Sequence, residues 1–143
     1  MEKRISLVTL GVGDISRSKA FYEQLGWHGQ EVQQTVFIQA GGIALVLWGR
    51  DKLAADCGVQ DVPAPGFGGI VLAHNVRSAA EVDEIVGAAA SAGATVTRPP
   101  GETFYGGYAA VFTDPDGHPW EIAHNPGFAL GEDGTLTLPD FSA

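Results

Sequence analysis

The chain has 143 residues, enough for one compact domain or for two small modules that share a core. Its 45% hydrophobic and 17% charged residues are typical of a globular protein and exclude a disordered chain. The net charge of −9, from 17 acidic and 8 basic residues without a basic cluster, argues against nucleic acid and anionic membranes as partners. No apolar stretch is long enough for a membrane span and the N-terminus lacks a signal-peptide pattern, so we expect a cytoplasmic protein.

The first half of the sequence predicts a strand, a helix and three more strands. Residues 5–10 alternate as in a strand, and Asp14 is the expected N-cap of a helix over residues 15–25 that ends at Gly26. Short strands are expected around residues 29–33, 35–39 and 43–48, with a turn at Gly41 and Gly42. Residues 51–57 are expected to form a short helical segment. Its Cys57, the single cysteine, excludes an intrachain disulfide and is predicted to be semi-buried rather than a nucleophile.

The second half repeats this order of elements. A strand is expected over residues 70–74, and Ser78 with Glu81 forms a capping-box signature before a helix that ends at Gly93. Strands are expected at residues 95–97, 108–112 and 120–123, with a turn over residues 114–117 before the last strand. The pattern predicts one module over residues 1–60, a proline-containing linker over 61–66 and a second module over 67–126. Residues 127–143 form a C-terminal tail with a hairpin around residues 132–134.

Two motifs resemble one family. Residues 12–22 (VGDISRSKAFY) and residues 112–122 (FTDPDGHPWEI) look like the opening helix and closing strands of the glyoxalase, bleomycin resistance protein and extradiol dioxygenase superfamily. The resemblance covers about residues 4 to 126 and implies an α+β fold of two βαβββ modules, with mixed curved sheets around a cavity. It implies no single reaction, since the superfamily hosts isomerases, lyases, dioxygenases, thiol transferases and metal-free drug-binding proteins.

The metal ligands of such relatives fall on poor donors in this sequence. The resemblance places the four ligand positions at Leu7, near Val46, within the segment 69–71 that starts with Gly69, and at Glu121. Only Glu121 is a residue type that binds metal ions. A catalytic divalent metal needs about three imidazole, thiolate or carboxylate ligands, so we expect no metal and no other cofactor. A rearranged site would need histidines, which are expected at a strand end, in a turn and past a strand: His74, His118 and His124.

The resemblance therefore implies an apolar cavity with Glu121 as its one carboxylate. We hypothesise that Glu121 anchors a ligand donor or cation or acts as a general base; the alternative is a structural carboxylate bonded to backbone or to Tyr108. Aromatic residues beside glycines offer stacking surfaces for a planar ligand, or else cap the end of the sheet. The predicted ligand-binding residues are Glu121, Leu7, Val46, Trp48, Gly69, Phe104, Tyr105 and Tyr108.

Three functions remain open on this basis. The favoured one is a metal-free protein that binds an aromatic or cationic small molecule. The others are a metal-independent lyase or isomerase with Glu121 as its base, and a metalloenzyme with displaced ligands. We also expect a homodimer, because modules of this type pair their sheets within or between chains.

Overall fold

The computed structural model describes residues 1–62 and 66–142. The chain forms two compact units, Met1–Gly69 and Ile70–Ala143. The division falls just beyond the predicted linker, of which residues 63–65 lie outside the described ranges, and the C-terminal tail belongs to the second unit.

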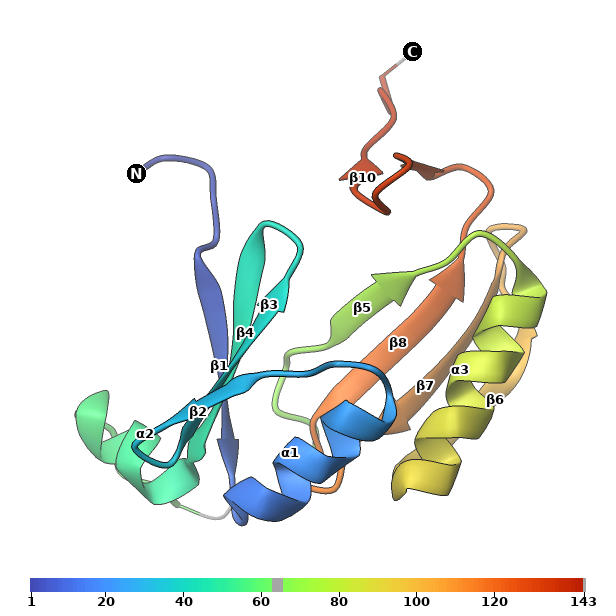
Figure 1. Ribbon diagram of the computed structural model, residues 1–143. Helices are drawn as coiled ribbons and strands as arrows, with labels where there is room; N and C mark the ends of the chain where they lie inside the picture. The colour runs from blue at the N-terminus through green and yellow to red at the C-terminus, as the bar shows by residue number, and fades with distance from the viewer. Residues whose placement is uncertain (63–65, 143) are drawn as a thin grey trace. The chain divides into compact units, whose positions relative to one another are not determined.

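The first unit is a four-stranded mixed sheet with a helix on one face (Figure 1). The strand order is β1-β4-β3-β2, in which β1 runs parallel to β4 and the other neighbours are antiparallel. The elements follow one another as β1 (Leu7–Val12), α1 (Ile15–Gln24), β2 (Gln30–Val32), β3 (Thr35–Ala40), β4 (Ile43–Gly49) and α2 (Arg50–Asp56).

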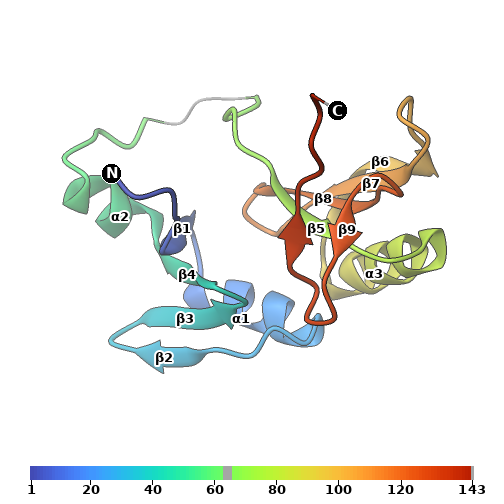
Figure 2. The ribbon, with the colours of Figure 1, turned by 90° about the horizontal axis from the view of Figure 1, so that it is seen from above.

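The second unit has the same topology. Its sheet has the order β5-β8-β7-β6, again with one parallel pair, β5 with β8. Figure 2 shows α3 against one face of this sheet. The elements are β5 (Leu72–Asn75), α3 (Ala79–Ala92), β6 (Thr95–Glu102), β7 (Tyr108–Thr113) and β8 (Pro119–His124), followed by the hairpin strands β9 (Ala129–Leu130) and β10 (Leu136–Thr137). The predicted α+β class with two βαβββ modules is confirmed.

Strand alternation decides which face of each sheet is covered by a helix. In the first unit the buried strand residues other than Val46 occupy one face, and the buried side chains of α1 include Phe21 and Tyr22. In the second unit the buried Phe112, Trp120 and Ile122 share a face, and α3 buries three small apolar residues. Because strand residues alternate between faces, their neighbours in sequence lie on the opposite side of each sheet. We call these the face opposite α1 and the face opposite α3.

The helix ends agree with the sequence. Asp14 caps α1 by accepting a hydrogen bond from the Arg17 backbone N–H at 3.0 Å. The Ser78 hydroxyl accepts one from the Glu81 backbone N–H at 3.2 Å, as the capping-box signature predicted. α3 ends at Gly93 with a φ of 113°, a left-handed conformation that favours glycine.

The expectations for Cys57 and for the end of β6 were wrong. Cys57 is exposed rather than semi-buried, because α2, which precedes it, has no buried residue within Arg50–Asp56. The strand expected to end at Thr97 continues to Glu102, through two prolines that argue against an ordinary strand. It tolerates them because β6 lies at the edge of the sheet and its pairing with β7 is interrupted by bulges.

The C-terminal hairpin predicted around residues 132–134 is present as β9 and β10. Arg77, which lies just before α3, donates hydrogen bonds from its guanidinium to the backbone carbonyls of Leu130, Gly131 and Glu132. The hairpin is thereby tied to the start of the helix. Among the described residues, no helix has the length and apolar character needed to cross a bilayer.

Candidate binding site

Strand pairing in the two units identifies equivalent positions on their sheets. Counted back from the helix N-caps, Thr9 of β1 is equivalent to Ala73 of β5. Thr9 pairs with Val46, and Ala73 pairs with Glu121. Val46 and Glu121 therefore occupy the same place in the two units, each on the face opposite the helix.

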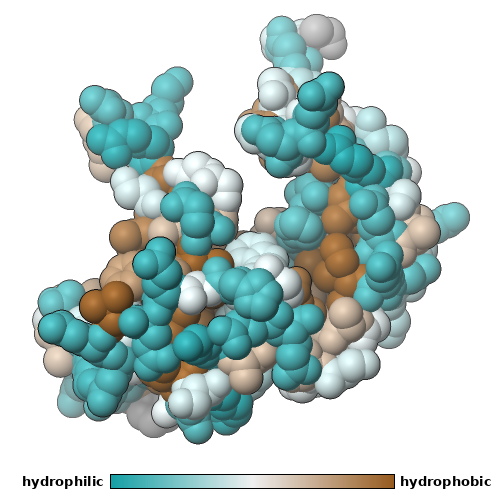
Figure 3. All heavy atoms as spheres, in the orientation of Figure 1, coloured by the Kyte–Doolittle hydropathy of each residue, from teal (hydrophilic) through white to brown (hydrophobic). Residues whose placement is uncertain are grey.

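In the first unit this position has apolar neighbours. Leu7, Val46 and Trp48 lie on the face opposite α1, together with Phe37, which pairs with Val46. Leu7 is 49% exposed and Phe37 43% exposed, whereas Val46 is buried. Hydrophobic residues, brown in Figure 3, reach the molecular surface in both units. The first unit thus places three of the predicted ligand-binding residues on one sheet face and supplies no metal donor among them.

Gly69 does not belong to a strand. We expected a strand from residue 70, but β5 begins at Leu72 and Gly69 is an exposed residue with a φ of 85° before it. The β5 residue that lies beside Glu121 is Ala73. This segment also offers no donor for a metal ion.

Glu121 lies on β8, on the face opposite α3. Its cross-strand neighbours are Ala73 of β5 and Val111 of β7. Its carboxylate Oε2 is 3.4 Å from Nη2 of Arg98, and the two side chains are 34% and 53% exposed. Within the described part of the chain, Arg98 is the one hydrogen-bonding partner of this carboxylate. The alternative of a bond to backbone or to Tyr108 is therefore not what the structure shows.

Tyr108 lies on the other side of the sheet from Glu121. Its hydroxyl donates a hydrogen bond of 2.7 Å to Oδ1 of Asp83, a residue of α3. This hydrogen bond, which holds the proton on the phenol, raises the pKa of Tyr108. The structure does not bring Tyr108 together with Glu121.

Phe104 and Tyr105 lie in the loop between β6 and β7. Their rings are in edge-to-face contact with centroids 5.2 Å apart, and Phe104 is fully exposed. Tyr105 lies against Gly107, where an added Cβ would be only 2.6 Å from Cε2 of the tyrosine ring. The same added Cβ would be 2.5 Å from the backbone oxygen of His124, so Gly107 and the Tyr105 ring lie at the end of the sheet where β8 ends. Tyr105 is therefore the predicted aromatic residue that lies at the end of the strand that carries Glu121.

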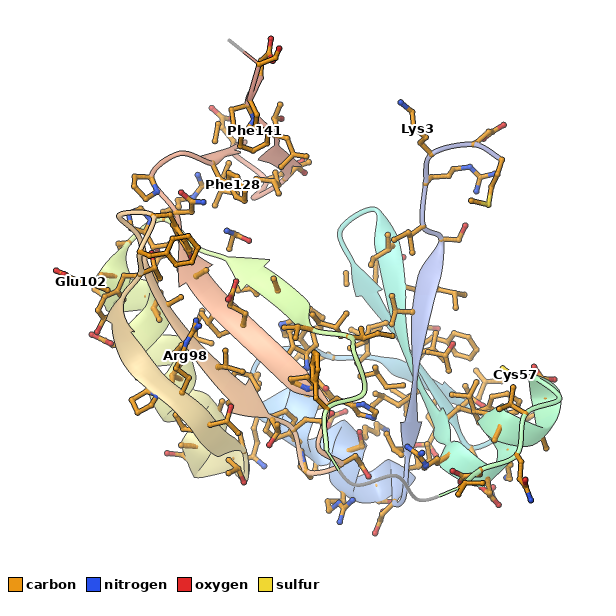
Figure 4. The ribbon with its side chains drawn as sticks, turned by 180° about the vertical axis from the view of Figure 1, so that it is seen from behind. Lys3, Cys57, Arg98, Glu102, Phe128 and Phe141 are labelled. Carbon is orange, nitrogen blue, oxygen red and sulfur yellow. The ribbon has the colours of Figure 1, made fainter. Side chains whose placement is uncertain are left out.

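Sequence analysis missed Arg98. The pairing of β6 with β7 shifts between Val96 and Arg98, so that Thr97 is an extra residue. A bulge of this kind turns the next side chain to the other face, which places Arg98 opposite Val111 and on the side of Glu121. Figure 4 shows Arg98 on this face, extending from β6 over β7. The pair of prolines after Arg98 was the available signal, since prolines within strands are found at edges and bulges.

The residues at the positions of the family's metal ligands do not fit a divalent ion. Leu7, Val46 and residues 69–71 have no side-chain donor, and Glu121 alone provides one carboxylate where about three ligands are required. Across residues 1–62 and 66–142, no group of three or more histidine, cysteine, aspartate or glutamate side chains is arranged to hold a metal. The three histidines considered for a rearranged site do not form one: His74 lies in β5, His118 in a turn and His124 at the end of β8.

The chain is similar in sequence and in structure to several solved proteins. The chain is 36% identical to a glyoxalase-related enzyme from Fulvimarina pelagi, with a TM-score of 0.89 over 97% of this chain and 100% of that one. It is 26% identical to a glyoxalase/bleomycin resistance protein/dioxygenase family enzyme from Burkholderia phytofirmans PsJN, with a TM-score of 0.71 over 83% and 96% of the two chains. No match was found among curated proteins.

The family model provides the assignment. The model of the Glyoxalase/Bleomycin resistance protein/Dioxygenase superfamily matches residues 4–122, most of the chain. Its span includes both βαβββ units and the residues discussed above, from Leu7 to Glu121. The chain belongs to the glyoxalase/bleomycin resistance protein/dioxygenase superfamily.

Proposed function

We propose that this protein binds a small organic molecule without a metal ion, with Glu121 as the polar anchor. The observation that carries the proposal is a partly exposed carboxylate on a sheet face, held by one long contact of 3.4 Å to Arg98. A carboxylate has about four acceptor sites. Most of the capacity of Glu121 is therefore free for an amine, a hydroxyl or another donor of a ligand.

The surroundings of Glu121 support an aromatic ligand with a cationic or donor group. Tyr105 provides a ring at the end of the sheet where β8 ends, and planar ligands stack on such rings. Ligand sites combine apolar surface with a few polar groups that fix orientation. Leu7, Val46, Trp48, Gly69 and Phe104 remain predicted ligand contacts, and the resemblance extends to metal-free drug-binding proteins of the superfamily.

The test is a binding screen with matched variants. Planar aromatic amines are titrated into the wild type, Glu121→Gln and Glu102→Gln, and binding is followed by thermal shift and tryptophan fluorescence. Glu102 is a suitable control because it is exposed on the same sheet but pairs with Tyr108, which faces α3. We expect Glu121→Gln to weaken binding about tenfold or more, as for a lost hydrogen bond to a charged group, and Glu102→Gln to leave it unchanged. Equal binding by all three proteins would refute the role of Glu121.

The metal-free part of the proposal has its own measurement. Elemental analysis of protein purified without chelator is expected to find no divalent metal in stoichiometric amount. Stoichiometric zinc, nickel, iron or manganese would contradict the proposal and favour a metalloenzyme.

A lyase or isomerase is the second candidate, favoured by the cation beside Glu121. A carboxylate that removes a proton next to a carbonyl works better when a positive group stabilises the developing oxyanion, and Arg98 lies 3.4 Å from Glu121. The similar Fulvimarina protein is described as an enzyme. Hydrogen–deuterium exchange next to the carbonyl of bound ketones, lost in Glu121→Gln, would support this function, and its absence would leave binding alone.

A further inference from the structure

The bulge in β6 creates a pair of opposite charges on an otherwise uncharged sheet face. The structure describes every strand-paired position on the face opposite α3. Arg98 is the one cation among them and Glu121 the one acid; the others are Thr95, Gly101, Ala109, Val111, Thr113, Ala73, Asn75, Pro119 and Ala123. The charged groups at the strand-paired positions of this face are therefore one guanidinium and one carboxylate.

Arg98 has unused hydrogen-bonding capacity. A guanidinium carries five N–H donors, and in the described part of the chain Arg98 uses one, toward Glu121. The distance of 3.4 Å is long for a charge-assisted bond, and the side chain is 53% exposed. An exposed ion pair of this kind is weak, so a ligand can insert between its members at little cost.

The surface beside this ion pair suits an apolar ligand body. Between Arg98 and the end of the sheet near Tyr105, the next row of residues on this face is Gly101, Ala109 and Ala123, with Asn75 on the far edge strand. No long side chain of the sheet separates the ion pair from the aromatic ring. From Val111 to Gly107 the strand spans about 13 Å, enough for an aromatic side chain to extend from the charges toward Tyr105.

The net charge of the protein restricts the ligand further. A chain with a net charge of −9 repels a simple anion at long range, so a ligand that uses Arg98 should not be an anion overall. A zwitterion satisfies both requirements. Its carboxylate binds a guanidinium in a bidentate manner, and its ammonium group binds a carboxylate.

We infer that the site around Arg98 and Glu121 selects an amine that also bears a carboxylate, such as an aromatic amino acid. Arg98 binds the carboxylate, Glu121 binds the ammonium group, and the aromatic body extends toward Tyr105. This inference rests on the proposed function, which assigns a donor or cationic group of the ligand to Glu121. It adds a second charged group and assigns Arg98 to it.

The test compares aromatic amino acids with the amines that lack only the carboxylate. Phenylalanine and phenethylamine, tyrosine and tyramine, and tryptophan and tryptamine are titrated into the wild type by calorimetry. The same pairs are titrated into Arg98→Gln and Arg98→Lys, with Arg4→Gln as a matched control. Arg4 is an exposed residue of the N-terminal segment that pairs with Glu2, so this control repeats the charge change away from β6.

In the wild type, at least one amino acid is expected to bind about tenfold or more tightly than its amine. Arg98→Gln is expected to remove this preference while leaving amine affinity nearly unchanged. Arg98→Lys, which keeps the charge but loses the planar donor geometry, is expected to retain part of it. Arg4→Gln is expected to behave as the wild type.

The outcomes separate this inference from the proposed function. If amines bind in a Glu121-dependent manner but amino acids bind no more tightly, the inference is overturned and the proposed function stands. If amines and amino acids both bind without dependence on Glu121, the proposed function fails and the inference fails with it. A carboxylate preference that survives in Arg98→Gln would show that another residue binds this group.

Discussion

The two units share a topology but differ in the chemistry of equivalent sheet positions. Each has a four-stranded sheet with one parallel pair, and in each the helix begins after the first strand at a capping side chain. Val46 of the first unit corresponds to Glu121 of the second, and Leu10 to His74. The first sheet has apolar residues where the second has a carboxylate and a histidine. A repeated fold can therefore keep its packing while equivalent positions on its sheets change from apolar to ionisable residues.

The largest effect is expected from truncating a core phenylalanine in each unit. Comparing the two losses of unfolding free energy tests whether the two cores are equally well packed. Phe21 in the first unit and Phe112 in the second are almost fully buried. Truncating either to alanine should cost about 3–5 kcal/mol of unfolding free energy, because it removes apolar contacts and leaves a cavity. Urea unfolding of Phe21→Ala and Phe112→Ala measures both costs. A cost below about 1 kcal/mol in either unit would show that its core relaxes easily and that the units differ in packing.

A smaller effect is expected from exchanging the equivalent side chains on the two sheets. Val46→Glu places a charge at a buried position and should cost more than about 2 kcal/mol, because the position has no cation beside it in its unit's strand pairing. Glu121→Val should change stability by less than about 0.5 kcal/mol, since it removes only a long, exposed ion pair. Similar costs for the two variants in thermal or urea unfolding would contradict the difference inferred between the faces.

The smallest expected effect concerns pH and His74. Burial lowers the pKa of His74, and the negative charge of Glu81 partly opposes this shift. Below the ordinary histidine pKa of about 6.5 the unfolded chain binds the proton more readily than the folded chain. Stability should therefore fall as the pH is lowered from about 7.5 to about 5.5, and His74→Gln should reduce that dependence.

The effect of His74 is expected to be modest because burial of this residue on the edge strand β5 is only partial. Urea unfolding of the wild type and His74→Gln at several pH values measures it. If the unfolding free energy depends on pH identically in the two proteins, His74 does not contribute to the pH dependence of stability.

Much of the fold was predictable because the local signals agree with one another. Asp14, Ser78 and Gly93 define helix ends by their own hydrogen bonds or backbone conformation, which depend on a few neighbouring residues. Strand alternation and the family resemblance also predicted that Glu121 lies on the last strand of the sheet, on the same face as Pro119 and Ala123. Such features need no knowledge of the tertiary structure.

The remaining features depend on contacts between strands. Arg98 reaches Glu121 because of a bulge whose position is set by the pairing of β6 with β7, and simple alternation from Thr95 would place it on the other face. Tyr108 was grouped with Glu121 although its partner is Asp83 of α3. Arg98 was missed because one shift in register reverses the side of the sheet to which a residue points, whereas Tyr108 follows ordinary alternation along β7.

The contacts of Arg77 also bear on how this protein can be shortened or fused. Its guanidinium donates hydrogen bonds to three backbone carbonyl groups of the hairpin β9–β10, which follows β8. A positive charge is unfavourable at the N-terminus of a helix such as α3, and these carbonyl oxygens partly neutralise the charge of Arg77. A fragment that stops at the end of the family match would leave this arginine without those acceptors. Expression designs for the second unit should therefore retain the chain through Thr137 and place any added segment beyond it.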